Sequence, residues 1–307
     1  MKASSFTPRG LRVAGAAGTL VLAASLAACS SSSDRATGSD LGKTDSSAPF
    51  YNQVPAQYRK GISVALQVNA PPLSMAGSDG KPTGEDPELF AELSKQLGVP
   101  INIKPTTFEN ELLGLDQGKY DFIAQTNITS DREQKYDQLS QFKDGYALVG
   151  LKGGTTIPNS LSGLCGATIA AQSGDGGTDY LVEKSKQCTS NGDKAIKLVQ
   201  LKSIPEEYVT VASGRAQAAM APISTLSYFL ASKDKQLGKS WQFTGPRMLP
   251  VLAGYSFPKG SKLITAVQSG IEALMKDGTY KAILDKNGLS ENVATSALIN
   301  PTPPVAK

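Results

Sequence analysis

The stretch Glu85–Gly98, EDPELFAELSKQLG, predicts a helix with two clear ends. Asp86 is a residue type that favours the N-cap, and Pro87 suits the first helical position, where its missing N–H is not needed. Leucines recur at every fourth residue and form one apolar stripe, and the closing glycine suits a C-cap. The stripe has to be buried, so this helix must pack against other elements of a core.

The segments around this helix alternate apolar and polar residues, as half-buried strands do. The sequence predicts strands at 61–68, 99–105 and 120–126, and a short helix at 109–118. The order strand, helix, strand, helix, strand is typical of an α/β unit built on a mostly parallel sheet.

A second run of strands and helices indicates a second α/β unit of similar size. Two such units with short connections predict a cleft between them, and ligands of open α/β sheets bind beyond the carboxyl ends of the strands. We therefore expect functional residues at strand ends rather than within helices. The remaining chain predicts strands at 146–152, within 160–174, at 196–201, at 216–221 and within 249–261, and helices at 178–188, 205–214, 223–231, 262–278 and 279–288.

The N-terminal segment has the pattern of an export signal. Lys2, Arg9 and Arg12 form a positive region, and residues 13–28 follow without a charge. This uncharged run is too short and too rich in Ala and Gly for a comfortable membrane span, which needs about 20 apolar residues. It is therefore interpreted as a cleavable signal.

Residues 26–29, LAAC, resemble the lipobox of bacterial lipoproteins, in which the cysteine is lipidated and becomes the mature N-terminus. The alternative is an ordinary signal peptide with an incidental cysteine. We expect 1–28 to be a lipoprotein signal peptide and Cys29 to carry acyl chains, several of which anchor more stably than one. The Ser- and Gly-rich composition predicts a flexible tether over 29–58, and the Pro-rich end predicts a disordered tail over 293–307.

Charge and composition exclude several classes of function. The 307-residue chain has a net charge of +4, of which three basic residues lie in the first 28 and leave +1 for the rest. Duplex nucleic acid needs a clustered basic face, so no nucleic-acid partner is expected. The absence of histidine removes Ser-His-Asp and Cys-His mechanisms and histidine metal sites. No carboxylate or lysine acid/base pair stands out at a strand end, so we expect no enzyme, no cofactor and no metal.

The stretch Asn127–Glu133, NITSDRE, has two compatible interpretations. Ser130 and Glu133 fit a capping box, which needs no ligand. Alternatively, Thr129 and Arg132 hold an anion together with backbone N–H groups at the start of a helix, because those groups are unpaired and a guanidinium matches a carboxylate with two parallel bonds.

The stretch 172–178, QSGDGGT, follows a predicted strand and precedes a predicted helix. Its Gly-rich backbone can present N–H groups to a ligand, with Ser173 and Asp175 as the candidate side chains. The alternative is a plain turn in which glycine supplies a positive φ.

Cys165 and Cys188 are predicted to form a disulfide, because an exported protein meets oxidising conditions. The alternative is a pair of buried free thiols. A bridge would stabilise the fold by roughly 3 kcal/mol in the chain-entropy model.

Seven segments in order resemble bacterial extracellular solute-binding proteins of family 3, the receptors of polar amino-acid ABC importers. Each segment is a weak signal alone, but the shared order and the lipoprotein signal agree. The segments are APPLSM (70–75), GEDPELFAELSKQLGV (84–99), FENELLGLDQGKYDFIA (108–124), NITSDRE (127–133), SLSGLCGATIAAQSG (160–174), VASGRAQAAM (211–220) and PKGSKLITAVQSGIEALMKDGTYKAIL (258–284).

The resemblance implies a two-lobe, periplasmic-binding-protein-like (Venus flytrap) fold of type II, with two crossing hinge strands. Lobe 1 would comprise residues 59–148 and 251–292, and lobe 2 residues 149–250. The implied function is a monomeric, lipid-anchored receptor on the outer face of the cell membrane. It would capture a small polar solute with a carboxylate, such as an amino acid, and deliver it to a membrane permease. The alternatives are a dehydratase of a cyclic carboxylate on the same fold, and a solute sensor that feeds no importer.

The resemblance also assigns roles to residues. The Thr-x-x-Arg pattern of Thr129 and Arg132 would contact the α-carboxylate of the ligand, with Thr126 and Asn127 beside it. Phe108 lies where relatives often place an aromatic wall, although core packing explains it equally well.

Relatives that bind α-amino acids usually offer an acid to the ammonium group from the end of the first strand and from lobe 2. Here those places carry Gln67, close to a second polar candidate Asn69, and Pro222. A buried ammonium without a counter-charge is unfavourable. Either Asp175 supplies the negative charge, or the ligand is not an ordinary α-amino acid.

Overall fold

The computed structural model describes residues 37–231 and 236–302. The predicted signal peptide 1–28 and the lipidation site Cys29 lie outside these residues. Within the described part of the chain, no helix has the length and apolar character that a membrane crossing requires.

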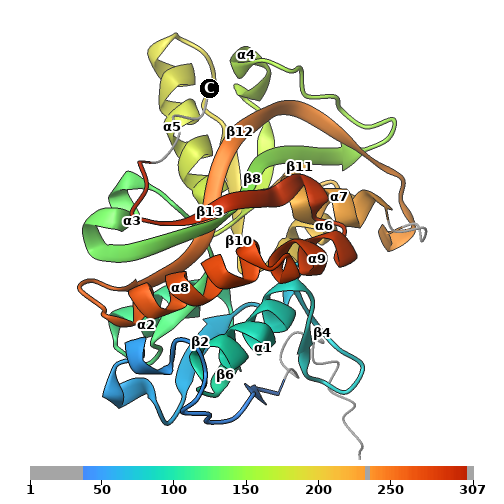
Figure 1. Cartoon of the computed structure of the whole chain (residues 1–307). Helices are drawn as coiled ribbons and strands as arrows, with labels where there is room; N and C mark the ends of the chain where they lie inside the picture. The colour runs from blue at the N-terminus through green and yellow to red at the C-terminus, as the bar shows by residue number, and fades with distance from the viewer. Residues whose placement is uncertain (1–36, 232–235, 303–307) are drawn as a thin grey trace, which may run out of the picture. The chain divides into compact units, whose positions relative to one another are not determined.

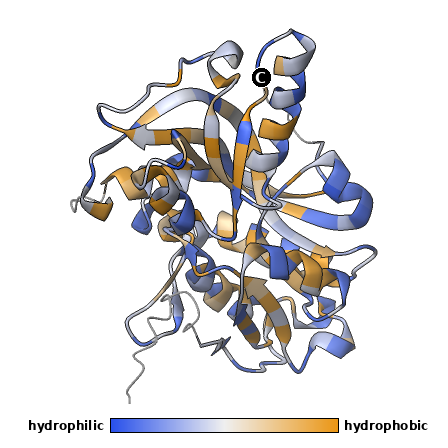
Figure 2. Ribbon diagram, turned by 180° about the vertical axis from the view of Figure 1, so that it is seen from behind, coloured by the Kyte–Doolittle hydropathy of each residue, from blue (hydrophilic) through white to orange (hydrophobic). Residues whose placement is uncertain are grey.

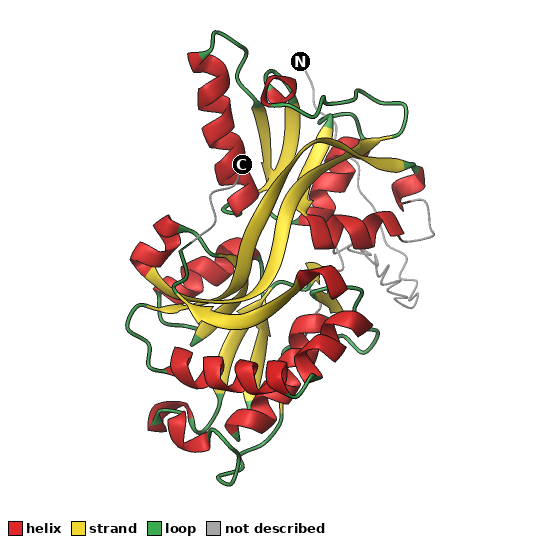
Figure 3. Ribbon diagram, turned by 45° about the horizontal axis from the view of Figure 1, so that its top comes forward, coloured by secondary structure: helices red, strands yellow, loops and turns green. Residues whose placement is uncertain are grey.

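Two long antiparallel strands, β8 (Tyr136–Leu151) and β12 (Trp241–Pro258), run side by side through both halves of the described fold (Figure 1, Figure 3). They join one sheet whose order is β1-β6-β2-β7-β12-β8-β11-β9-β10. The elements on the β7 side form lobe 1 and those on the β11 side form lobe 2. The type II two-lobe fold with two crossing strands is therefore confirmed. The predicted lobe boundaries, 148/149 and 250/251, fall inside these two strands.

Lobe 1 has three layers. β2 pairs in parallel with β6 and β7, as the alternating sequence predicted. Helices α1, α8 and α9 cover one face of these strands, and α2 packs against the other. The bounds are β2 Ile62–Leu66, α1 Glu85–Leu97, β6 Ile101–Pro105, α2 Phe108–Asp116, β7 Phe122–Asn127, α3 Ser130–Lys135, α8 Leu263–Lys276 and α9 Thr279–Lys286.

Lobe 2 repeats this arrangement. β9 pairs in parallel with β10 and β11, and β11 pairs with β8 in the antiparallel sense. Helices α6 and α7 pack on one face and α4 and α5 on the other. The bounds are α4 Leu161–Leu164, β9 Thr168–Gln172, α5 Gly176–Ser190, β10 Lys197–Leu201, α6 Ile204–Ala212, β11 Ala218–Pro222, α7 Ile223–Ala231 and the 3-10 turn η4 Gln236–Gly238.

The predicted flexible tether is wrong for residues 37–58. β1 (Ser39–Leu41) pairs with β6, and the side chain of Val54 is fully buried in the lobe 1 core. A few apolar side chains in this segment pack against the lobe and hold it in place. The prediction failed because it rested on the overall polar composition of the segment. The short elements here and between β2 and α1 are η2 Tyr51–Gln53, η3 Ala56–Tyr58, β3 Asn69–Ala70, β4 Ser74–Ala76 and β5 Pro82–Thr83.

The predicted disordered tail is also wrong for residues 293–299. After the 3-10 turn η5 (Ser290–Asn292), β13 (Val293–Ile299) pairs with β8. Ala294 and Ala297 are buried, and the register of the strand against β8 shifts between Val293 and Leu298. Only the prolines that follow β13 led the sequence reasoning to disorder, because prolines cannot donate to a ladder.

Helix α1 ends as predicted but starts differently. Gly98 is the C-cap in a left-handed conformation. Gly84, not Asp86, is the N-cap, with a φ of 117°, and a Cβ there would lie 2.7 Å from the carbonyl oxygens of Pro72 and Leu73. Asp86 is buried and accepts a hydrogen bond from the side chain of Gln125 at 2.7 Å. The acidic side chain therefore points into lobe 1 instead of capping the helix.

Aromatic side chains form the centre of the lobe 1 core. Phe90 of α1 lies 5.7 Å from Phe122 and 5.4 Å from Tyr255, between ring centroids. Phe122 stacks on Phe257 at 5.0 Å. In Figure 2 hydrophobic residues recur along the strands and helices of this lobe. Because Tyr255 and Phe257 belong to β12, the crossing strand is fixed to the core of lobe 1.

The disulfide is present. Cys165, at the end of α4, is bonded to Cys188 in α5. The bridge connects two helices on the same face of lobe 2, and Cys188 is fully buried in the core cluster there.

Gly254→Ala should lower the free energy of unfolding by about 3 kcal/mol or more, because the new methyl group has no space. Gly254 of β12 pairs with Ser140 of β8, and a Cβ would lie 2.0 Å from the carbonyl oxygen of Leu139. Gly214→Ala is the control: its Cβ meets nothing within 4 Å, and only its φ of +77° opposes the change, at about 1–2 kcal/mol. Urea unfolding of both variants checks the difference, and equal losses would contradict the close approach.

Candidate functional site

A cleft lies between the two lobes, at the carboxyl ends of strands from both. Its cavity volume is about 40 Å³. Its lining comes from lobe 1, from lobe 2 and from both crossing strands. The lining residues are Gln67, Ala70, Leu73, Gln125, Asn127, Phe142, Asp144, Gly145, Tyr146, Gln172, Asp175, Ile204, Pro222, Thr225, Val251 and Ala253. The two charged residues among them, Asp144 and Asp175, are both acidic.

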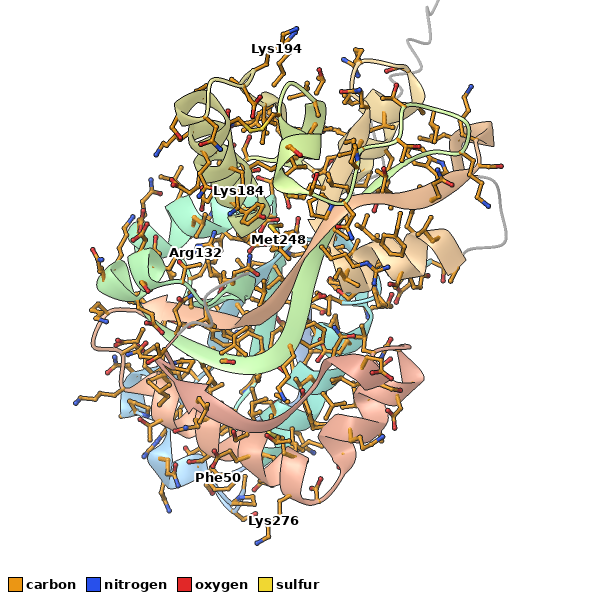
Figure 4. The ribbon with its side chains drawn as sticks, turned by 90° about the horizontal axis from the view of Figure 1, so that it is seen from above. Phe50, Arg132, Lys184, Lys194, Met248 and Lys276 are labelled. Carbon is orange, nitrogen blue, oxygen red and sulfur yellow. A yellow bond between two sulfur atoms is a disulfide. The ribbon has the colours of Figure 1, made fainter. Side chains whose placement is uncertain are left out.

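Arg132 lies at the edge of this cleft and bridges the lobes. Its Nη1 donates to the backbone oxygen of Asn127 in lobe 1 at 3.2 Å, and its Nη2 donates to that of Gly174 in lobe 2 at 2.7 Å. Arg132 belongs to α3, and Figure 4 shows it on the side toward α5, the helix that carries Lys184. A guanidinium has five N–H donors, so these two bonds leave others for a ligand.

The capping box predicted for Ser130 and Glu133 is wrong. Thr129 is the N-cap of α3, and its hydroxyl accepts from the backbone N–H of Arg132 at 3.2 Å. Thr129 has extended dihedrals and Ser130 is already helical, so the cap falls one residue earlier. Thr129 thereby fixes the backbone of Arg132.

The ring of Phe108 packs against the guanidinium of Arg132. The guanidinium carbon lies 5.7 Å from the centroid of the Phe108 ring, within the range of a cation–π contact. Phe108 is only 1% exposed and does not line the cleft. Its ring therefore packs in the interior, as the core-packing alternative predicted, and it also touches the arginine.

A buried chain of hydrogen bonds connects the lobes behind Arg132. Asn127 donates to the hydroxyl of Tyr146 on β8, and Tyr146 donates to the carboxylate of Asp175 at 2.5 Å. Asp175 is also the N-cap of α5 and accepts from the backbone N–H of Gly176 at 2.8 Å. Burial raises the pKa of Asp175, while Tyr146, Arg132 and Gly176 act in the opposite direction. Tyr146 was not singled out from sequence.

Two glutamines make a second bridge. The side chain of Gln172, at the end of β9, donates to the side chain of Gln67, just beyond β2, at 2.9 Å. Behind each lies a fully buried glutamate, Glu111 behind Gln67 and Glu207 behind Gln172. Burial raises the pKa of both carboxyls well above the usual range. The backbone N–H of the nearby glutamine offsets part of this rise in each case, although it is not placed well enough to count as a hydrogen bond.

Gln125 connects the cleft to a buried acidic cluster. It lies within β7 with a φ of 56°, a left-handed conformation that is unfavourable for a residue with a side chain. Its Nε2 donates to Asp86, and its own side-chain oxygen is buried without a partner among the described residues. Burial raises the pKa of Asp86 to about 7 and that of the neighbouring Glu85 well above its usual range. Sequence reasoning missed Gln125, because nothing in a strand pattern signals a bulge.

Asp144 is the second acidic residue that lines the cleft, and the sequence analysis did not predict it. It lies on β8 and its carboxylate accepts from the backbone N–H of Gly145 at 2.8 Å and of Ser224 at 3.2 Å, and from the Ser224 hydroxyl at 2.5 Å. Burial raises its pKa to about 6. Pro222 pairs with Tyr146, two residues from Asp144. The acid therefore lies next to the strand end that the sequence showed to be neutral, and only the strand register reveals it.

The other predicted residues lie near the cleft without lining it. Thr126 is fully buried and its hydroxyl bonds with that of Ser256 at 2.8 Å, which ties β7 to β12. Asn69 is half-buried on β3, and Ser173 directs its backbone N–H to Leu201 at 2.9 Å. Arg132 and these three are absent from the lining, whereas Gln67, Asn127 and Asp175 belong to it. Within the described residues no group of His, Cys, Asp and Glu is arranged to hold a metal ion.

The cleft between two α/β lobes, with crossing strands and an arginine at its edge, agrees with a comparison of the sequence with known families. The family described as bacterial extracellular solute-binding proteins, family 3, matches residues 62–290. The chain belongs to this family. The match covers both lobes and both crossing strands.

Individual members of the family have low sequence identity to this chain. The L-cystine-binding protein TcyJ of Escherichia coli K12 is 27% identical over 237 residues, which cover 74% of this chain and 82% of that protein. The arginine-binding protein ArgT of Corynebacterium glutamicum is 25% identical over 236 residues, 76% of each chain. Among solved structures, an ancestral arginine-binding protein bound to arginine has a TM-score of 0.65 at 25% identity, covering 74% of this chain and 97% of that one. These relatives are binding proteins for amino acids.

Asp86→Asn should make the stability less sensitive to rising pH. The pKa of Asp86 is raised from 3.8 to about 7, so the folded state binds this proton more tightly than the unfolded chain. The resulting stabilisation is complete below about pH 4 and is lost as the pH rises through about 7. Urea unfolding over that range should show a steeper loss in the wild type than in the variant. Parallel curves would exclude a raised pKa at this position.

Proposed function

We propose that the chain is the substrate-binding lipoprotein of an ABC importer, and that it captures an amino acid or a related carboxylate between its lobes. It acts by binding and not by catalysis. The observation that carries the proposal is Arg132, whose guanidinium contacts backbone oxygens of both lobes at the edge of the polar cleft. Family membership and the amino-acid-binding relatives support the same class of ligand.

In this proposal the ligand carboxylate binds Arg132. The guanidinium is fixed by Thr129 through the backbone and by the ring of Phe108, so its remaining N–H groups are already oriented. A carboxylate placed there can accept two parallel N–H bonds.

The ligand ammonium then faces Asp175. This carboxylate lines the cleft and accepts from Tyr146 and Gly176, which leaves lone pairs for a further donor. The unpaired side-chain oxygen of Gln125 is an additional acceptor on the lobe 1 side. Of the two alternatives raised by the sequence, this is the one in which Asp175 supplies the missing negative charge.

Such a ligand would contact both lobes at once. Arg132 and Gln125 belong to lobe 1, and Asp175 belongs to lobe 2. A ligand that binds both sides favours the arrangement in which they are close, which is how hinge closure is coupled to binding. A permease in the membrane would recognise the closed form and accept the solute from it.

Delivery to a membrane permease is helped by an anchor. We propose that Cys29 is lipidated after removal of residues 1–28 and holds the protein at the outer face of the cell membrane. The support is the sequence LAAC at 26–29 behind a positive and then apolar segment.

Arg132→Ala should weaken amino-acid binding by about 30-fold or more, because the ligand carboxylate would be buried without its charge partner. Isothermal titration with L-arginine, L-glutamine and L-cystine measures the effect. Lys135→Ala is the matched control, since Lys135 lies on the same helix but is exposed and pairs with Asp116 at 2.6 Å. Unchanged affinity of the Arg132 variant would overturn the proposed carboxylate site.

Cys29→Ser should release the protein from the membrane fraction, because no residue would then accept the acyl chains. Expression of both forms in a bacterial host, followed by fractionation and mass spectrometry of the N-terminal peptide, measures this. A wild-type N-terminal peptide without acyl chains would reject the anchor.

A further inference from the structure

We propose that the cleft selects an α-amino acid whose side chain ends in a cation, and that Asp144 on the crossing strand β8 is the residue that binds this cation. The inference rests on the proposed function, because it assumes that an amino acid occupies the cleft. It goes further by naming the class of side chain that the ligand carries and the residue that binds this side chain.

Asp144 is positioned near the residues that are proposed to bind the ammonium group. Asp144 and Tyr146 are two residues apart on β8, and side chains at that spacing point to the same face of a strand, roughly 7 Å apart. Both line the cleft, and the hydroxyl of Tyr146 bonds to Asp175. Asp144 is therefore a neighbour of the proposed ammonium site, at a distance that a side chain of several atoms spans.

The two acids of the cleft differ in the charges around them. Burial raises the pKa of Asp175 and the positive guanidinium of Arg132 acts against this rise, so Arg132 already supplies a cation to that carboxylate. Among the described residues no arginine or lysine acts in this way on Asp144, although Lys143 and Arg247 line a neighbouring cavity with it, and its three hydrogen bonds come from neutral donors. Among the described residues Asp144 forms no ion pair. A buried carboxylate is unfavourable unless it is hydrogen-bonded and paired, and a bound cation would add the pairing that Asp144 lacks.

The charges of the cleft and the bound amino acid balance when the side chain of the ligand is a cation. A ligand carboxylate would neutralise Arg132 and a ligand ammonium would neutralise Asp175, which leaves Asp144 negative. A neutral side chain would bury this charge uncompensated, whereas a guanidinium or ammonium would pair with it. A second carboxylate, as in cystine, would find no lysine or arginine among the lining residues and would lie near an acid of the same sign.

A structural role for Asp144 is the competing explanation. Its carboxylate accepts from the backbone N–H of Ser224, in the first turn of α7, and so satisfies a helix N-terminus. Asparagine keeps an oxygen that can accept this bond and removes only the negative charge. Asp144→Asn therefore separates the two roles, because a purely structural residue would affect all ligands equally.

The test is isothermal titration of the purified chain with L-arginine and with L-citrulline, which has the same length but a neutral side-chain end. The wild type should bind arginine about tenfold or more tightly than citrulline, as expected for a hydrogen-bonded charge pair. In Asp144→Asn the preference should fall to about one, with citrulline affinity within about threefold of wild type. Asp193→Asn, an exposed change in lobe 2, should keep the preference.

Two further measurements make the outcome decisive. Asp175→Asn should weaken both ligands and keep their ratio, because it would contact the ammonium that they share. L-cystine should bind more weakly than arginine. Equal binding of arginine and citrulline by the wild type, an unchanged preference in Asp144→Asn, or tighter binding of cystine would each overturn the inference while leaving the proposed function intact. Failure of all amino acids and of simple carboxylates to bind would overturn the proposed function and the inference with it.

Discussion

The antiparallel pairing of β8 with β12 is the interaction on which the rest of the structure depends. Each strand contributes hydrogen bonds to both lobes, and β12 also supplies two aromatic rings to the core of lobe 1. Because Gly254 has no side chain, the two strands approach closely where they enter that lobe. The lobes are thus connected by continuous sheet and not by a loose linker, which restricts their relative motion to bending of two strands.

The polar groups of the cleft lie on the ends of elements that are rigid elsewhere. Arg132 follows a cap residue, Asp175 is itself a cap, and Asp144 is held by three donors from β8 and α7. Such groups lose little conformational freedom when they bind a solute. The strained backbone of Gln125 fits the same pattern, since unusual dihedrals concentrate at sites that position ligands.

Periodicity and turn chemistry predicted the regular elements well, because each of those patterns is local. Helix α1 and strand β6 follow from spacing alone. The polar halves of the crossing strands did not, since residues such as Gln138 are buried by partners more than a hundred positions away. The same reason explains the site: Asp175 lies in a recognisable Gly-rich loop, whereas the position of Asp144 follows only from the pairing of Tyr146, two residues along β8, with Pro222.

The amide pair of Gln67 and Gln172 has a consequence for how the receptor discriminates among solutes. The bond joins the lobes without any atom of the solute, so it contributes the same free energy to closure whatever is held between them. Its strength therefore multiplies every affinity by one common factor and leaves their ratios unaltered. Retention and discrimination are thereby assigned to different side chains, and each can change in evolution without disturbing the other.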